Sequence, residues 1–227
     1  MPRQTFDQKL QLLQAEVQLM GSMVDTALGS AVEALLCQDS PRAWQLLKDN
    51  CHIVGKRAAL EAETLSQIAT QQPVAGDLRI LVAVLEVTAE LERMGGYAAS
   101  IAQTTINLAD QPLPEPFPAI LPRMGDCGRE MLRQAMLALA HRDVTLARTV
   151  PARDEDVDRL YTQVCQALAT VIKSDPTSTH QASSLSRVAH NLERTADRVV
   201  NICEWVVFAI TGEMKELNGS EVSPPQF

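Results

Sequence analysis

Apolar residues recur every three or four positions along most of the chain, which is the pattern of helices with one buried face. Six helices are predicted in this way, over residues 6–37, 40–69, 73–108, 119–140, 144–173 and 179–211. We expect Pro151 to kink the fifth helix, because proline cannot donate a backbone hydrogen bond. Gly212 is a helix-ending residue after the sixth. The pattern predicts an all-α fold.

The second half of the chain repeats the first. Residues 90–96 match residues 191–197 at a spacing of 101, and residues 34–39 match residues 138–143 at a spacing of 104. Because short turns between long helices make neighbours antiparallel, we expect two tandem three-helix bundles of six long antiparallel helices, related by internal duplication.

The domain boundaries follow from a proline-rich break between the halves. We expect a first bundle over residues 1–110 and a linker over residues 111–118. A second bundle over residues 119–213 and a flexible tail over residues 214–227 complete the chain. The linker is assigned because closely spaced prolines interrupt a helix.

Composition narrows the class of protein. The aromatic content of 4% argues against a β-sandwich or barrel. The formal net charge is −8, and no basic stripe is present, so we expect no nucleic-acid partner. No signal core and no uninterrupted apolar run of ~18 residues is found. We therefore expect a cytoplasmic protein that meets a membrane only indirectly, through partners.

The cysteines and tryptophans suggest packing roles. The five cysteines are far apart, form no C-x-x-C pair and lie mostly in apolar helical stretches. Buried, reduced thiols are therefore expected. Trp44 and Trp205 are interpreted as anchors of the core or of an interface.

The most distinctive stretch for chemistry is residues 191–201. Glu193, Asp197 and Asn201 are four residues apart, so they form one column of oxygen-bearing side chains on a helix. This column is either a solvated face or half of an oxygen-ligand cation site. Arg194 and Arg198 are interleaved with the acids, so salt bridges are a competing interpretation.

Several motifs together resemble the PhoU family, the accessory regulators of the phosphate-specific transport system. They are Gln-Gln-Pro-Val-Ala-Gly-Asp-Leu-Arg at residues 71–79, Leu-Glu-Arg-Met-Gly at residues 91–95 and Asn-Leu-Glu-Arg-Thr-Ala-Asp at residues 191–197. The resemblance covers residues 6–213. It implies two three-helix bundles, a homodimer, a cytoplasmic location and metal clusters bound by paired Asp/Glu-x-x-x-Asp motifs.

The second half keeps the motif pattern that the resemblance implies. Asp154 and Asp158 lie on the fifth predicted helix, and Glu193 and Asp197 lie on the sixth. The implied cofactor is one or more divalent or iron-type metal ions, with Fe, Mn, Mg and Zn not distinguished. A competing explanation is that acids near a helix start complement the helix dipole.

The first half departs from the pattern. Glu92 is retained, but Gly96, Asn50 and Val54 stand at the other three positions. One carboxylate and one amide bind a divalent ion poorly, so we expect a degenerate first site and one metal site per chain.

The resemblance implies a negative regulator of phosphate uptake and of the phosphate-starvation response. It would act by binding the phosphate transporter's ATPase and a sensor histidine kinase. No nucleophile–base set, P-loop or dinucleotide glycine motif is found, so an enzyme is not expected. The alternatives are a metal-independent helical adaptor and a carboxylate-bridged di-metal enzyme, which would need Glu-x-x-His pairs.

Overall fold

The computed structural model describes residues 2–108 and 111–217, and within these ranges it contains helices and no β-strand. The first half is made of α1 (Pro2–Cys37), α2 (Ser40–Gln71) and α3 (Ala75–Asn107). The second half is made of α4 (Phe117–His141), α5 (Val144–Thr149), η1 (Val150–Arg153), α6 (Asp154–Ser174), η2 (Pro176–Ser178) and α7 (Thr179–Thr211). The predicted all-α fold of two tandem bundles is confirmed.

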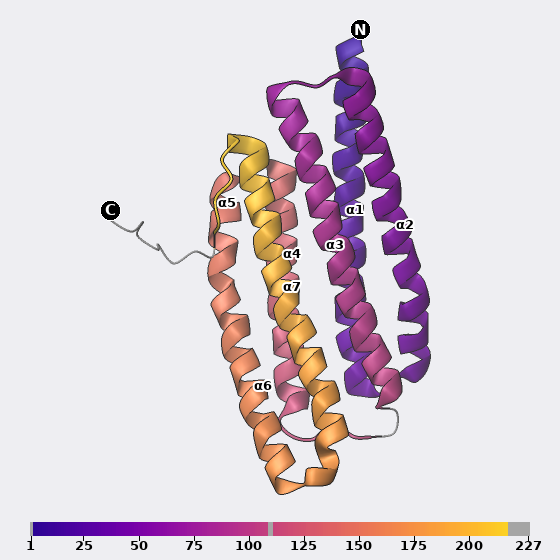
Figure 1. Cartoon of the computed structure of the whole chain (residues 1–227), viewed down its shortest axis with the longest axis vertical. Helices are drawn as coiled ribbons and strands as arrows, with labels where there is room; N and C mark the ends of the chain where they lie inside the picture. The colour runs from indigo at the N-terminus through magenta and orange to yellow at the C-terminus, as the bar shows by residue number, and fades with distance from the viewer. Residues whose placement is uncertain (1, 109–110, 218–227) are drawn as a thin grey trace, which may run out of the picture.

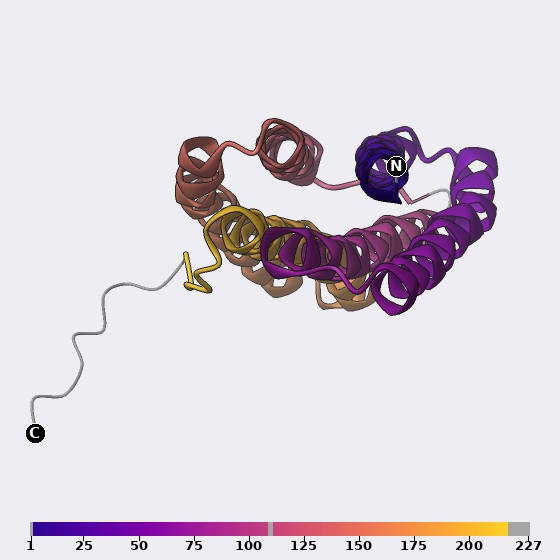
Figure 2. The same ribbon diagram turned by 90° about the horizontal axis from the view of Figure 1, so that it is seen from above.

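The two bundles lie side by side and share one core. Figure 1 shows α1, α2 and α3 as one bundle beside α4, α6 and α7 as the other. Seen from above, α1 and α4 lie next to each other in one layer, and α3 and α7 lie next to each other in a second layer (Figure 2). The buried apolar side chains of both bundles form a single cluster.

Matching turns confirm the internal duplication. Gln38 and Arg142 adopt the same left-handed backbone, with φ of 53° and 54°. Asp39 and Asp143 follow them, and each accepts a hydrogen bond from a backbone N–H three residues on, at 2.9 Å in both cases. An aspartate at this position satisfies a donor that the helix start leaves unpaired. The same device therefore begins α2 and α5.

The fifth predicted helix, over residues 144–173, is broken in the structure. It consists of α5, the 3₁₀ turn η1 and α6, and Pro151 lies in η1. The expected kink is thus a full interruption, because the proline ring clashes with the carbonyl four residues earlier in an α-helix. This break fixes where α6 begins.

Two further boundaries differ from the sequence-based expectation. Helix α4 begins at Phe117, inside the range assigned to the linker, because Pro118 sits in the first turn, where proline is tolerated. A short 3₁₀ helix, η2, occupies part of the turn before α7. Helix α7 ends at Gly212 with φ of +80°, as predicted. Of the predicted flexible tail, residues 218–227 lie outside the described residues.

The sequence predicted no apolar stretch long enough to span a membrane, but helix α1 is more apolar than this prediction implies. By length and composition alone, its segment Phe6–Cys37 could span a bilayer. That expectation counted uninterrupted apolar runs, whereas α1 mixes apolar residues with small and uncharged polar ones. Its apolar stripe is buried against α2, α3 and α4. This is the packing of a core helix.

The expectation of buried thiols is wrong for most cysteines. Cys203 is buried, Cys127 is half-buried, and Cys37, Cys51 and Cys165 are exposed, although all five are free. The exposed three lie on the outer sides of their helices, where the apolar stripe does not reach. Burial raises the pKa of the Cys203 thiol to about 12, so this thiol stays protonated.

The two tryptophans differ in their surroundings. The side chain of Trp44 is 53% exposed, whereas Trp205 is half-buried and packs edge-on against Phe208. Trp44 is therefore no core anchor within this chain.

Candidate functional site

The four predicted metal-ligating residues lie on two helices that pack against each other. Asp154 and Asp158 are one turn apart at the start of α6, and Glu193 and Asp197 are one turn apart on α7. Asp154 is the first residue of α6 and is buried, while Asp158 is exposed and the two α7 acids are half-buried. The interruption at Pro151 thus sets the position of the α6 pair.

The charges of three of these carboxylates influence one another. Burial raises the pKa of Asp158 first, and the charge of Asp197 raises it further. The pKa of Glu193 is also raised, chiefly by burial and then by Asp197, with a smaller contribution from Asp158. Like charges disfavour the ionised form of their neighbours. The structure therefore brings Asp158, Glu193 and Asp197 into one acidic cluster.

The acids of this cluster have few partners. Within the described residues, the carboxylates of Asp158 and Asp197 make no hydrogen bond or ion pair. The Oε2 atom of Glu193 is buried and accepts no hydrogen bond, although His190 Nδ1 lies 3.2 Å away. This contact is an ion pair only when the His190 imidazole is protonated. A buried carboxylate oxygen without a donor is costly unless a cation or donor meets it.

The salt-bridge interpretation fails for the two interleaved arginines. The Arg194 guanidinium lies over the ring of Tyr97 on α3, with 5.5 Å between its Cζ atom and the ring centroid. Arg198 Nη1 lies 3.4 Å from Oε2 of the buried Glu90, also on α3. Both side chains reach across to the first bundle instead of pairing with the acids on their own helix. Neither arginine therefore makes an ion pair with Glu193 or Asp197, and the Arg194 charge only partly offsets the raised pKa of Glu193.

The helix-dipole interpretation retains support for part of the α6 acids. Asp154, Glu155 and Asp156 all lie in the first turn of α6. Asp156 also pairs with Arg159. The dipole does not account for Asp158, Glu193 and Asp197, which lie beyond the first turns of their helices.

The side chains are not gathered around a common point. Among residues 2–108 and 111–217, no group of three or more His, Cys, Asp or Glu side chains is placed so that it could hold a metal ion. The cluster offers oxygen ligands in the right neighbourhood, but the ligand set of Asp154, Asp158, Glu193 and Asp197 stays a prediction.

The corresponding place in the first half has a different character. Arg57 Nε lies 3.3 Å from Oε2 of Glu92, so the retained acid faces a cation from its own chain. Gly96 has no side chain, and Val54 is an exposed hydrophobic residue. The Oδ1 atom of Asn50 is buried without a hydrogen-bond partner.

Sequence reasoning missed two neighbours of the acidic cluster. The rings of Tyr161 and His190 lie 6.5 Å apart between centroids, and His190 Nδ1 lies 3.2 Å from Oε2 of Glu193. Burial raises the pKa of Tyr161, with further contributions from Cys165 and Glu193. The spacing of three between His190 and Glu193 was a usable signal, because residues three apart share a helix face.

Comparisons with known proteins agree with the architecture. The sequence model of the family described as the PhoU domain matches residues 17–105 and 121–206, once in each half. The phosphate-specific transport system accessory protein PhoU homolog of Clostridium acetobutylicum is 32% identical over 96% of this chain and 100% of its own. The homolog of the same name from Deinococcus radiodurans is 34% identical over 88% of this chain and 93% of its own.

Two solved structures are similar in fold. The crystal structure of PhoU from Pseudomonas aeruginosa has a TM-score of 0.87 and 27% identity, covering 92% of this chain and 100% of that one. The phosphate transport system regulatory protein PhoU from Streptococcus pneumoniae has a TM-score of 0.85 and 26% identity, covering 92% and 99%.

Proposed function

Because the chain belongs to the PhoU family, we propose that it is a negative regulator of phosphate uptake and of the phosphate-starvation two-component response. The family match in both halves carries this proposal. It is strengthened by relatives aligned over nearly the whole chain that are named accessory proteins of the phosphate-specific transport system. A solved neighbour is named a regulatory protein of phosphate transport.

The proposed partners are the ATPase of the phosphate transporter and the associated sensor histidine kinase. The protein would work in the cytoplasm as a homodimer and reach the membrane only through these partners. Exposed large apolar side chains, among them Trp44, Leu12 and Val74, provide surface for such contacts. Binding would be the output of the protein, with no reaction catalysed.

A cation at the acidic cluster is part of the proposal. The cluster suits a hard cation in its donor chemistry, since Asp158 and Asp197 are unpaired and Glu193 Oε2 is buried without a donor. Asp154 would complete the set from one turn earlier on α6. When bound, the cation supplies positive charge. The chain's own residues would then hold α6 against α7 without mutual repulsion.

Two alternative functions can be separated from a metal-dependent regulator. A helical adaptor without metal would bind the same partners through packing surfaces alone. A di-metal enzyme would need a Glu-x-x-His pair from each of two helices. His190 lies beside Glu193 on α7, but α6 offers Asp154 and Asp158 without an imidazole at such a spacing.

A genetic test addresses the regulatory role. Deleting the gene should raise phosphate uptake and the activity of a phosphate-starvation promoter in phosphate-rich medium, and the wild-type gene should restore both. If deletion changes neither quantity, the proposed function is wrong. Binding of purified protein to the transporter ATPase and to the kinase's cytoplasmic portion tests the two partners separately.

The Asp197→Ala variant separates the regulator from the adaptor. In a metal-dependent regulator, this variant should lose metal, melt at a lower temperature and fail to restore repression. In an adaptor, it should restore repression fully with an unchanged melting temperature. Glu92→Ala, which changes the corresponding acid of the first half, serves as the matched control.

A further inference from the structure

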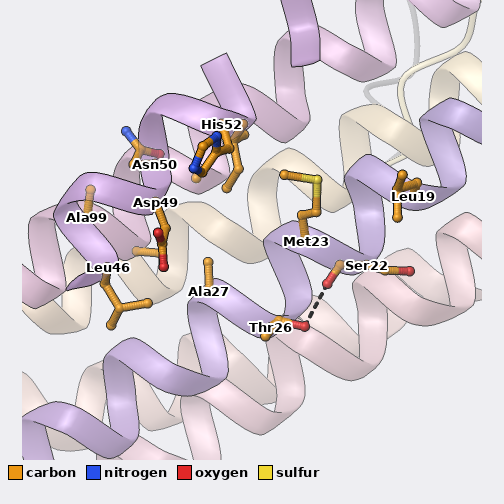
Figure 3. Close-up of a pocket in the computed structure, with 13 residues that line it drawn as sticks. Leu19, Ser22, Met23, Thr26, Ala27, Leu46, Asp49, Asn50, His52 and Ala99 are labelled. Atoms are coloured by element: carbon orange, nitrogen blue, oxygen red, sulfur yellow. Dashed lines mark hydrogen bonds between the residues drawn. The ribbon is translucent and has the colours of Figure 1, made fainter. Parts of the chain in front are cut away.

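The first half contains a cavity that the acidic cluster does not touch. It has a volume of about 450 Å³ and lies among α1, α2 and α3 (Figure 3). Its apolar lining includes Met23, Ala27, Leu46, Ile53 and Ala98. The volume falls in the range of small-molecule pockets, which are mostly apolar with a few polar groups.

Small residues create this cavity, and the internal duplication shows which ones. At the spacing of 104, Ala27 corresponds to Met131, and at the spacing of 101, Ala98 corresponds to Val199. Met131 and Val199 are completely buried in the second bundle. In the second bundle, these larger side chains therefore fill the space that the alanines leave open in the first bundle.

The path of the helix differs at the same place. The interruption η1 in the second half corresponds to residues 46–49 of α2, which continue as an unbroken helix past the cavity. In the first half, the uninterrupted helix α2 and small side chains together leave the cavity open. The cavity therefore lies between three continuous helices, α1, α2 and α3.

The cavity lining also includes His52, but the buried side-chain polar atom of the lining that lacks a hydrogen-bond partner is an acceptor. Asn50 Oδ1 is buried and accepts no hydrogen bond, and it would lie 3.1 Å from a Cβ atom at Gly95, which also lines the cavity. Asp49 contributes a carboxylate at the edge. The hydroxyl hydrogens of Ser22 and Thr26 already go to backbone carbonyls, at 3.1 and 2.9 Å. A ligand that pairs with Asn50 Oδ1 therefore brings its own donor.

We propose that this cavity binds a small apolar molecule that carries a hydrogen-bond donor, of the class of aromatic or aliphatic amines. The apolar body contacts Met23, Ala27 and Ile53, and the amine donates to Asn50 Oδ1 with Asp49 nearby. A protonated amine complements the negative carboxylate and satisfies the unpaired amide oxygen. This site is separate from the acidic cluster and does not rest on the proposed regulatory function.

Calorimetric titration of the full chain with 1-naphthylmethylamine tests the proposal. We expect saturable binding of one molecule per chain. Ala27→Met, which installs the residue of the second half, should weaken binding at least about tenfold by filling the cavity. Ala62→Met, at an exposed position of α2 outside the cavity lining, should leave binding unchanged and controls for the added side chain.

Two further arms test the donor requirement and guard against misfolding. Asn50→Leu should weaken binding of the amine by about tenfold, and 1-naphthylacetate should bind far more weakly than the amine. Ala99→Val, again the residue of the second half, replaces Ala27→Met if that variant does not fold. The proposal is overturned if the amine does not bind saturably, if both methionine variants bind it equally, or if the carboxylate binds as well as the amine. If the amine does not bind, the cavity is better explained as a docking site for a side chain of a partner protein.

Discussion

The two halves of this chain share their buried positions and differ where a ligand could bind. Most of the buried residues of α3 recur on α7 at the same spacing of 101, and most of those of α2 recur on α5 and α6 at the spacing of 104. The second half keeps an acidic cluster in which Asp158 and Asp197 are unpaired, whereas the first half pairs Glu92 with Arg57 and contains a cavity.

This difference shows which parts of a duplicated fold are free to diverge. A core position must remain apolar and fit its neighbours, because a poor fit costs stability directly. An acid on a half-exposed helix face carries no such constraint once its ligand is lost. Glu92 was retained in the first half, and it now faces a cation of its own chain.

The largest expected effect lies at the ion pair that joins the halves. Glu90, whose side chain is 7% exposed, faces Arg198 across the α3–α7 contact. Asn191, which occupies the corresponding position of the second half, instead donates a hydrogen bond to Ser100. Glu90→Gln should lower the free energy of unfolding by about 3 kcal/mol, because it leaves a partly buried arginine without its carboxylate. Urea denaturation measures this loss. Arg93→Ala removes only the exposed partner of Glu90 and should cost less than about 1 kcal/mol. Equal costs would contradict the interface role.

A second effect concerns the volume difference between the bundles. Met131→Ala should cost about 2–3 kcal/mol, because it creates in the second half the cavity that the first half already has. The reciprocal Ala27→Met should leave stability unchanged or raise it, since its side chain enters existing space. Thermal unfolding of both variants checks this asymmetry. A large cost for Ala27→Met would show that the first bundle cannot accept the larger residue.

The smallest expected effect is one that should be equal in the two halves. Asp39→Ala and Asp143→Ala each remove a side-chain acceptor at a helix start and should each cost about 1 kcal/mol. Chemical denaturation of the single variants and of the double variant measures both terms. The costs should add, because the two caps lie on different elements. A cap that costs nothing would indicate that its helix start is stabilised mainly by packing.

Much of the fold could be predicted from the sequence, because apolar spacing fixes which helix faces are buried. The stripe from Phe6 to Leu35 is buried as predicted, and the repeats at 101 and 104 identify the duplication. The break at Pro151 was underestimated, since one proline can either bend a helix or end it depending on its packing. The exposure of Cys51 was misjudged for a related reason: an apolar neighbourhood in sequence does not specify the side of the helix.

The candidate site was only partly accessible from the sequence. Periodicity places Glu193 and Asp197 on one face, but the partners of Arg194 and Arg198 lie on α3, which local spacing cannot reveal. The cavity was missed, although its signal is present in the repeat. Aligning the halves pairs Ala27 with Met131 and Ala98 with Val199, and consistently smaller residues in one copy indicate missing volume.

The central claim is that the halves have specialised and that only the second holds a metal ion. Elemental analysis of protein purified without chelator or a metal-affinity tag tests this most directly, on the wild type, on Glu193→Ala/Asp197→Ala and on the matched first-half control Glu92→Ala. We predict about one or more metal ions per chain in the wild type and in the control, and their loss in the double variant. Metal retained in the double variant, or absent from the wild type even after metal is added back, would contradict the claim.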